Sequence, residues 1–280
     1  MPKGIEEANE LELLLTDAKN CIQVIGSNSE AFKTFLISLA HMPNEIISNL
    51  AILSMNCSPP PAEVHTCNEW KNLGRFVKKG EIGVSVLVPN INKNEKSFTT
   101  GKVFDVSQTV EAFDIAKTHS NSAVADIKIV MKKLLQSSPV QCVPISDAEF
   151  NVRYNNETKI IEIKKGLDKN DLFMGLAQEI AHAYYAQEPE YTRSSMAFYA
   201  YSVSYLLTKY YRLDCSNYDF SASSEWLSFG DEETNQDEQT QIIKSRLGEI
   251  RSVFRKILEK LEPGSITDVS TVQLEGENND

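Results

Sequence analysis

The chain has 280 residues, enough for two modest domains with separate hydrophobic cores. Hydrophobic residues make up 41% of the sequence and charged residues 24%, which is typical of a globular protein and excludes a chain too polar to fold. The formal net charge of −11 argues against a protein that is coated in positive charge for binding nucleic acid.

The apolar runs and the cysteines bear on whether the protein is secreted, inserted in a membrane or held by metal sites or disulfides. No apolar run approaches the roughly 20 residues of a membrane helix, and the polar, acidic residues 1–9 do not form a signal peptide. The five cysteines are scattered, without a close pair that would indicate a metal site or a redox motif. Reduced thiols fit this pattern best, so we predict a cytoplasmic protein that does not bind membranes.

The first 60 residues show helical patterns. Apolar side chains at helical spacing predict three helices, over residues 5–25, 29–40 and 43–55. Gly26 to Ser29 predict a break after the first helix, and Ser29 is a candidate N-cap for the second. Pro43 is a candidate first residue of the third, and the three prolines at 59–61 end this helical lead.

The pattern then changes from helices to strands. Residues 84–88, which end at Pro89, and residues 102–106 carry the β-branched and aromatic side chains of strands. The polar stretch 90–100 between them predicts a hairpin loop. We therefore expect a small antiparallel sheet in the region 63–110, followed by a linker over 118–122.

The second half is mainly helical by its pattern, with one short hairpin. Helices are predicted over 123–135, 168–186, 192–211 and 236–261. Asp168 is the candidate cap of the second of these, and residues 151–154 and 159–163 predict a hairpin that turns at Asn155 and Asn156. Residues 264–280 contain four acids and no base, which predicts a disordered acidic tail.

These elements predict an α+β fold with two domains. The first domain, 1–118, has a helical lead over 1–60 and a small antiparallel sheet in the region 63–110. The second domain, 119–263, is mainly helical and begins with a short hairpin. The sequence shows no internal repeat.

Cationic and aromatic side chains lie close together after the helical lead. Residues 63–102 contain seven basic and four acidic residues, a net charge of +3 in an acidic chain. Proteins that bind single strands place cations along the nucleic-acid backbone and aromatic rings under the bases. The candidate DNA contacts are Trp70, Lys71, Arg75, Phe76, Lys78 and Lys79. Composition alone favours the alternative, in which the rings are core residues beside a solvated basic turn.

Residues 178–182 differ at one position from the H-E-x-x-H pattern of a zinc-protease helix. In that pattern both histidines bind zinc from one helix face, and the glutamate activates the zinc-bound water. Glu179 and His182 are in register here, but Gln178 stands where the first histidine would be. A side-chain amide is a poor zinc ligand beside imidazole, thiolate or carboxylate.

One pair of sequence blocks resembles the N-terminal domain of the ArdC-like antirestriction proteins. The blocks are 69–81 (E-W-K-N-L-G-R-F-V-K-K-G-E) and 103–109 (V-F-D-V-S-Q-T). The resemblance spans about residues 30–110, with Ser48 and Asn49 in the expected place in the helical lead. It implies an association with single-stranded DNA, and it favours DNA contacts for the lysines and Arg75 more than for Trp70.

A second pair of blocks resembles the metallopeptidase-like domain of the same proteins. Residues 160–167 are followed by 176–183 (L-A-Q-E-I-A-H-A), where the relatives carry L-A-H-E-x-A-H-A. Downstream, the relatives' E-A-E-S-V-A-Y helix supplies an acidic third ligand, but Tyr199 and Tyr201 stand at both acidic positions here. LtrC-like proteins of mobile elements, with L-A-Q-E-x-A-H and a similar aromatic helix, are the most similar in pattern.

This resemblance implies a degenerate metal site. A catalytic zinc needs about three protein ligands. Of the four vestigial positions, Gln178, His182, Tyr199 and Tyr201, only His182 carries a standard ligand. We therefore expect no zinc, no other cofactor and no catalytic residue, with Glu179 a vestige of the general base.

The resemblance implies a single-stranded DNA-binding accessory protein of a mobile element, acting in conjugation or antirestriction, with a catalytically inactive zincin-like domain. That domain would serve as a scaffold or as the surface for a protein partner. Two alternatives stay open. One is an active zinc metallopeptidase with an atypical site, which needs another ligand near His182. The other is a protein-interaction module that does not bind DNA, which the acidic charge balance allows.

Overall fold

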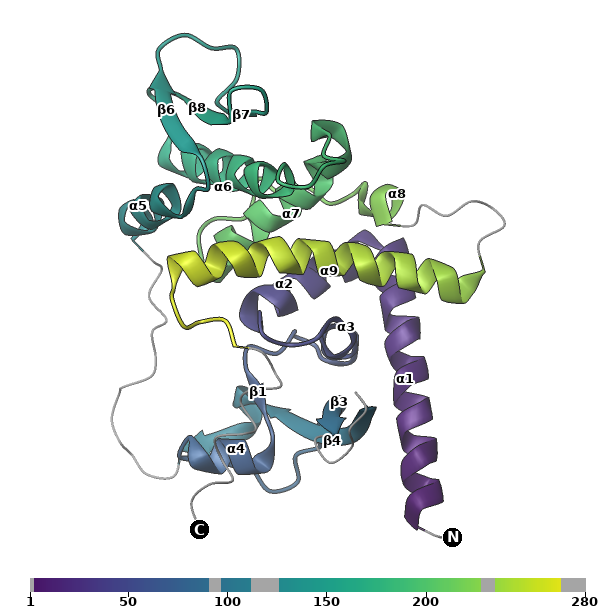
Figure 1. The fold of residues 1–280 in the computed structure, drawn as a ribbon. Helices are drawn as coiled ribbons and strands as arrows, with labels where there is room; N and C mark the ends of the chain where they lie inside the picture. Colours follow the sequence, from purple (N-terminus) through teal and green to yellow (C-terminus); the bar gives the residue numbers. More distant parts are fainter. Residues whose placement is uncertain (1–2, 91–96, 112–125, 228–234, 268–280) are drawn as a thin grey trace. The chain divides into compact units, whose positions relative to one another are not determined.

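The computed structural model describes residues 3–90, 97–111, 126–227 and 235–267 (Figure 1). The chain forms two compact units. Unit 1 consists of residues 1–122, 227–244 and 268–280, and unit 2 of residues 123–226 and 245–267. The contacts thus give 227–244 to unit 1, whereas the sequence analysis placed this segment in the second domain. The predicted linker and the tail from 268 onward lie outside the described residues.

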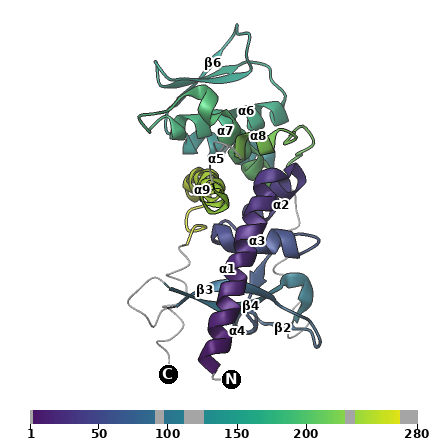
Figure 2. The same cartoon turned by 90° about the vertical axis from the view of Figure 1, so that its right-hand side faces the viewer.

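The fold class is α+β, as the sequence predicts. Unit 1 begins with the helices α1 (Lys3–Ser27), α2 (Ser29–His41) and α3 (Ile47–Asn56), which pack on one another. Figure 2 shows α1 running past α3 and the strands β3 and β4, both of which it contacts. One core cluster joins helices and sheet through the buried side chains of Leu14, Ala18, Ile52 and Leu87.

Two predicted helix starts are wrong. The helix α1 continues through Ser27, and the N-cap of α2 is Asn28, whose side chain accepts a hydrogen bond from the backbone N–H of Ala31 at 3.0 Å. Asparagine caps a helix as well as serine does, so Ser29 becomes the first helical residue instead. The helix α3 starts at Ile47 rather than at Pro43. Its N-cap residue is Ile46, whose backbone N–H donates to the Glu45 carboxylate at 2.8 Å.

A buried asparagine fixes α3 on the sheet. The side chain of Asn49 donates to the carbonyl oxygen of Leu87 at 2.9 Å and accepts from its N–H at 2.8 Å. Asn49 is only 3% exposed, so these two bonds satisfy an amide that would be costly to bury alone. This explains why Asn49 belongs to the motif noted in the helical lead.

The sheet of unit 1 has the order β1-β4-β3 and is antiparallel. Its strands are β1 (Val64–His65), β3 (Val84–Asn90) and β4 (Ser97–Asp105). The predicted loop over 90–100 is therefore too long, since Asn90 pairs with Ser97 and the strand continues from there. The aromatic and β-branched side chains of Phe98, Thr99 and Thr100 favour this extension. Residues 91–96 lie outside the described residues.

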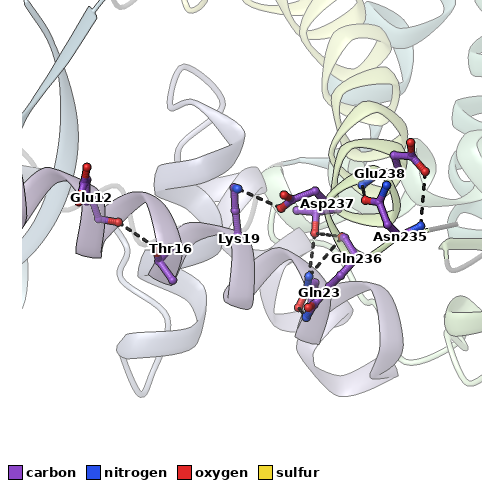
Figure 3. A network of polar contacts seen from close by, with 9 residues as sticks. Glu12, Thr16, Lys19, Gln23, Asn235, Gln236, Asp237 and Glu238 are labelled. Carbon is purple, nitrogen blue, oxygen red and sulfur yellow. Dashed lines mark hydrogen bonds and ion pairs between the residues drawn. The ribbon is translucent and has the colours of Figure 1, made fainter.

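The start of α9 (Gln236–Leu261) packs on α1 within unit 1 (Figure 3). Lys19 Nζ lies 3.0 Å from Asp237 Oδ1, and Gln23 Nε2 donates to Thr240 Oγ1 at 2.8 Å. Thr240 is buried, whereas the Lys19–Asp237 ion pair is exposed and contributes little to stability. The buried polar contact is therefore the stronger link between the two helices.

Unit 2 contains a small sheet of order β6-β8-β7 and a set of helices. The strands are β6 (Gln141–Ile145), β7 (Val152–Asn155) and β8 (Ile160–Lys164). The strands β7 and β8 form the predicted antiparallel hairpin. The strand β6 is parallel to β8 and was not predicted. It contains Pro144, which is tolerated because β6 is an edge strand.

Four helices of unit 2 follow the predicted patterns: α5 (Ile127–Ser137), α6 (Lys169–Tyr185), α7 (Arg193–Tyr210) and the remainder of α9. The short helix α8 (Ser223–Leu227) was not predicted. Asp168 caps α6 as predicted, by accepting from Asn170 N at 2.8 Å. Residues 264–267, the described part of the predicted acidic tail, follow α9, and the Glu259 carboxylate accepts the backbone N–H groups of Gly264 and Ile266 at 3.0 Å. Within the described ranges, no helix is both long and apolar enough to span a membrane.

Candidate functional site

The two N-terminal sequence blocks fold into one hydrogen-bonded structure in unit 1. The first block forms α4 (Cys67–Asn72) and β2 (Arg75–Val77), and the second forms the end of β4, a 3-10 turn (Val106–Gln108) and β5 (Thr109–Glu111). The strands β2 and β5 are antiparallel. Side chains join the blocks at 2.7–2.9 Å: Trp70 Nε1 to Phe104 O, Arg75 Nε to Thr109 Oγ1, Lys78 Nζ to Ser107 O and Gln108 Nε2 to Glu81 Oε2.

Asp105 organises the turn between β4 and β5. Its carboxylate accepts hydrogen bonds from the backbone N–H groups of Ser107 and Ala62, both at 2.9 Å. Burial raises the pKa of Asp105, but the hydrogen bonds from Ser107, Ala62 and Glu63 outweigh it and hold the pKa below the ordinary value. The aspartate of the V-F-D-x-S-Q-T pattern is thus a structural anion that fixes the start of β5.

An exposed basic and apolar surface lies on and next to β2. We define the β2–β5 surface by its exposed residues: Lys71, Leu73, Phe76, Lys78, Lys79, Ile82 and Val110. The Phe76 side chain is 47% exposed and lies in register with Val110, which is 48% exposed, so the two share one side of the ribbon. Ile82 is 81% exposed. The sequence analysis missed the contribution of the aliphatic residues.

Three predicted DNA contacts have internal partners: Trp70, Arg75 and Lys78, whose Nζ donates to Ser107 O at 2.7 Å while its side chain stays exposed. Trp70 is 1% exposed and packs edge-on against His65, with ring centroids 4.7 Å apart. A ring so buried offers no face to a base, so the assignment of Trp70 to the DNA contacts is corrected to a core role. Arg75 donates to the Glu111 carboxylate at 2.9 Å as well as to Thr109, and its guanidinium lies over Trp70. Arg75 therefore positions β5, and part of its charge is neutralised.

In unit 2, the glutamate that matches the general base of the H-E-x-x-H pattern belongs to a buried ion pair. Glu179 is 3% exposed. Arg193 donates from Nη2 to Glu179 Oε1 at 2.5 Å and from Nη1 to Oε2 at 2.8 Å. The backbone N–H of Tyr154 also donates to Oε2, at 2.7 Å. The carboxylate is therefore held by three structural donors.

His182 is buried and uncharged. It lies one helical turn from Gln178 on α6, as predicted, and is 1% exposed. Burial lowers its pKa to about 4, while Glu179 opposes this shift and Arg193 adds to it. The hydroxyl of Tyr191 lies 3.1 Å from Nδ1. This neutral, hydrogen-bonded imidazole corresponds to a core histidine.

Gln178 faces a cleft of about 470 Å³. The cleft is lined by Asn151, Asp171, Gln178, Glu179, Tyr201 and Tyr218, among others. The two tyrosines that stand where the resemblance expects acidic residues lie in different surroundings. Tyr201 lines this cleft and its hydroxyl accepts from Asp219 N at 2.8 Å, whereas Tyr199 is buried against Tyr185, with ring centroids 6.1 Å apart.

These residues do not fit a metal ion. Glu179 is held by Arg193, and of the matched side chains only the His182 imidazole is a standard zinc ligand, the others being an amide and two phenols. In the described part of the chain, no three His, Cys, Asp or Glu side chains are grouped so that they could hold a metal. The four vestigial positions are thus only partly brought together, and the absence of zinc stays a prediction.

The sequence analysis missed Arg193, Tyr191 and Tyr154. One signal pointed to Arg193, because a cation in the first turn of a helix opposes the helix dipole and usually needs a nearby carboxylate. Its partner, 14 positions earlier on another helix, could not be inferred from spacing. Tyr154 contributes its backbone N–H, which every residue except proline has, so its role cannot be predicted from its residue type.

Comparisons with known proteins find a likeness in structure. No protein-family description and no curated protein match this sequence. Among solved structures, the Mn(II)-bound antirestriction protein ArdC from plasmid R388 is similar, with a TM-score of 0.50 and 15% identity over 78% of this chain and 89% of that chain. The metal-free structure of the same protein has a TM-score of 0.46 and 14% identity, over 76% and 84% of the two chains. The likeness to the Mn(II)-bound structure shows that this chain has an ArdC-like fold.

Proposed function

We propose that this chain is a single-stranded DNA-binding accessory protein of a mobile element, acting in conjugation or antirestriction, with a catalytically inactive zincin-like unit 2. The ArdC-like fold and the two motif blocks support the mobile-element context. The exposed Phe76 ring beside Lys71, Lys78 and Lys79 carries the DNA-binding part of the proposal.

Charge and shape both favour single strands as the ligand. In a chain of net charge −11, exposed lysines near an exposed aromatic ring form a local binding surface rather than a general coat of positive charge. An unpaired base can stack on Phe76, and the lysines can contact the flanking phosphates. Paired bases in a duplex are stacked on each other and do not offer their faces to a side chain.

Unit 2 is proposed to be inactive because its carboxylate has a structural partner. The bidentate contact of Arg193 with Glu179 removes the general base that a metallopeptidase needs. This argues against the alternative of an atypical peptidase. The cleft beside Gln178 leaves unit 2 available for binding a protein partner.

The test is equilibrium binding of a fluorescent single-stranded oligonucleotide at several salt concentrations. Replacing Lys78 and Lys79 by alanine should weaken binding and reduce the salt slope by roughly 0.7 for each lost phosphate contact. The matched control is Lys128→Ala/Lys132→Ala, which removes two exposed lysines from α5 in unit 2. Absence of single-strand binding at low salt, or equal losses in both double variants, would refute the proposal and favour the interaction-module alternative.

A further inference from the structure

Arg193 supplies the positive charge that a buried carboxylate in unit 2 requires. Glu179 lies on α6 with 4% of its side chain exposed, whereas the Arg193 side chain, at the first position of α7, is 41% exposed. A carboxylate removed from water needs a cation or several donors beside it. Arg193 provides a cation in the planar, two-pronged geometry that matches a carboxylate.

The pair also completes the hydrogen bonding of an edge strand. In the order β6-β8-β7, one side of β7 has no neighbouring strand among the described residues. The N–H of Tyr154 donates to Glu179 at 2.7 Å, and the carbonyl oxygen of Tyr154 accepts from Arg193 Nη1 at 3.5 Å. The ion pair thus occupies both hydrogen-bonding positions that an added strand would use at Tyr154.

The members of this arrangement line two hollows. Glu179 lines the cleft that contains Gln178 and Tyr201. Arg193 and Tyr154 line a second groove, of about 570 Å³, together with Tyr191. The ion pair therefore connects α6, α7 and β7 at one point, where the carboxylate would otherwise face the cleft as an uncompensated charge.

We propose that Arg193 replaces a bound metal ion electrostatically: its guanidinium neutralises Glu179, holds α6, α7 and β7 together, and excludes divalent cations from the His182 end of α6. A metal ion at this place would need the negative potential of Glu179, which is already matched by a fixed positive charge at hydrogen-bonding distance. The inference rests on the proposed inactivity of unit 2 and does not depend on DNA binding by unit 1.

Gln178 and Arg193 are both consistent with a site that holds no metal ion. Without a metal, position 178 does not need an imidazole, and a neutral amide can line the cleft. The proposal therefore differs from a simple loss of ligands. While Arg193 remains, restoring the metal ligands would not restore metal binding.

The decisive experiment restores ligands with and without Arg193. The variant Gln178→His/Tyr201→Glu adds an imidazole and a carboxylate at two positions that line the same cleft, and this imidazole lies one helical turn before His182 on α6. Its zinc affinity is measured by chelator competition and by the rise in unfolding temperature with added zinc. Adding Arg193→Met should increase zinc affinity at least about tenfold, a change of roughly 1.4 kcal/mol. Equal affinity with and without Arg193 would overturn the proposal.

Arg193→Lys in the same background separates charge from geometry. It keeps the positive charge and loses the bidentate contact, so zinc should remain excluded. Strong zinc binding by this lysine variant would contradict the electrostatic argument.

The unmodified chain is treated with chelator in parallel. Loss of stability there would mean that the native protein holds a metal, which refutes the proposed inactivity of unit 2 and leaves the DNA-binding proposal untouched.

Because Arg193→Met can itself impair folding, a second measurement uses the native background. Glu179→Gln and Arg193→Met are compared singly and together by chemical denaturation. A glutamine at 179 can still accept the N–H of Tyr154, so the double variant should be less destabilised than the sum of the single variants. Additive effects would show that the two residues do not act as a pair.

Discussion

Arg75 and Thr109 lie 34 positions apart in the sequence, and Arg75 Nε donates a 2.7 Å hydrogen bond to Thr109 Oγ1. This contact joins the two motif blocks of unit 1. Thr109 is buried, and its hydroxyl also donates to Val106 O at 2.8 Å. The order and spacing of the blocks therefore reflect a local structure that requires both, with Arg75 as the residue that positions β5.

Thr109→Val should destabilise the protein by about 1–3 kcal/mol, because it keeps the shape of the side chain and leaves Arg75 Nε without this acceptor. Chemical denaturation measures the change. Thr99→Val is the matched control, since Thr99 is exposed on β4 and a valine suits a strand there. Equal stability of the two variants would show that the Arg75 contact contributes nothing.

Phe76→Ala should weaken single-strand binding by about 1–3 kcal/mol, the usual contribution of one stacked base. Its stability should change little, because the ring is 47% exposed. Phe76→Trp should retain the affinity. Phe98→Ala is the control, because Phe98 is an exposed phenylalanine of the same unit, on β4 outside the β2–β5 surface. A similar loss of affinity in both alanine variants would argue against stacking at Phe76.

Gly175→Ala should destabilise unit 2 by about 1–3 kcal/mol through overpacking. A Cβ at Gly175 would lie 2.9 Å from Val152 Cγ2 and 3.2 Å from Val152 Cβ, so β7 would be pushed away from α6. Val152→Ala in the same chain should recover part of the loss.

Gly248→Ala in α9 is the contrasting case. An added Cβ meets nothing within 4 Å there, so helix propensity should stabilise the protein by about 0.5–1 kcal/mol.

Stability should fall as the pH is lowered, because of His182. The folded-state pKa of about 4 lies below the ordinary value of 6.5, so between these values the unfolded chain binds a proton that the folded chain does not. Each pH unit in this window costs up to about 1.4 kcal/mol, and the cost is absent above the unfolded pKa. Denaturation between about pH 7 and about pH 5 should show a smaller slope for His182→Gln than for the native chain. Identical slopes would mean that His182 does not cause the loss.

The sequence predicted those elements whose burial is periodic. The helix over 236–261 and the hairpin around Asn155 follow from the spacing of apolar residues, because each buries one regular face. The strand β6 escaped prediction, because its parallel pairing with β8 depends on a crossover that leaves no local signal. Helix starts were wrong by a few residues where a different cap, such as Asn28, replaced the expected one.

The sequence identified the residues of the candidate site in unit 2 but not the side chains that they contact. The motif identified Glu179 and His182, while their contacts with Arg193 and Tyr191 come from a separate helix and loop. For Trp70, the residue type alone did not predict the role. An aromatic ring among lysines suits a core and a stacking surface equally well, and only its 1% exposure and its hydrogen bond to Phe104 distinguish the two.

The contact between α1 and the start of α9 has a consequence for the order of synthesis. Lys19 and Asp237 are 218 positions apart, and Gln23 and Thr240 are 217 apart. The ribosome therefore has to translate all of residues 123–226 before α1 can meet this partner. Until then the newly made helix lacks the cover that Ile243 gives to Gly26. Unit 1 can begin to fold early, but this part of its packing forms only after residues 237–243 have been translated.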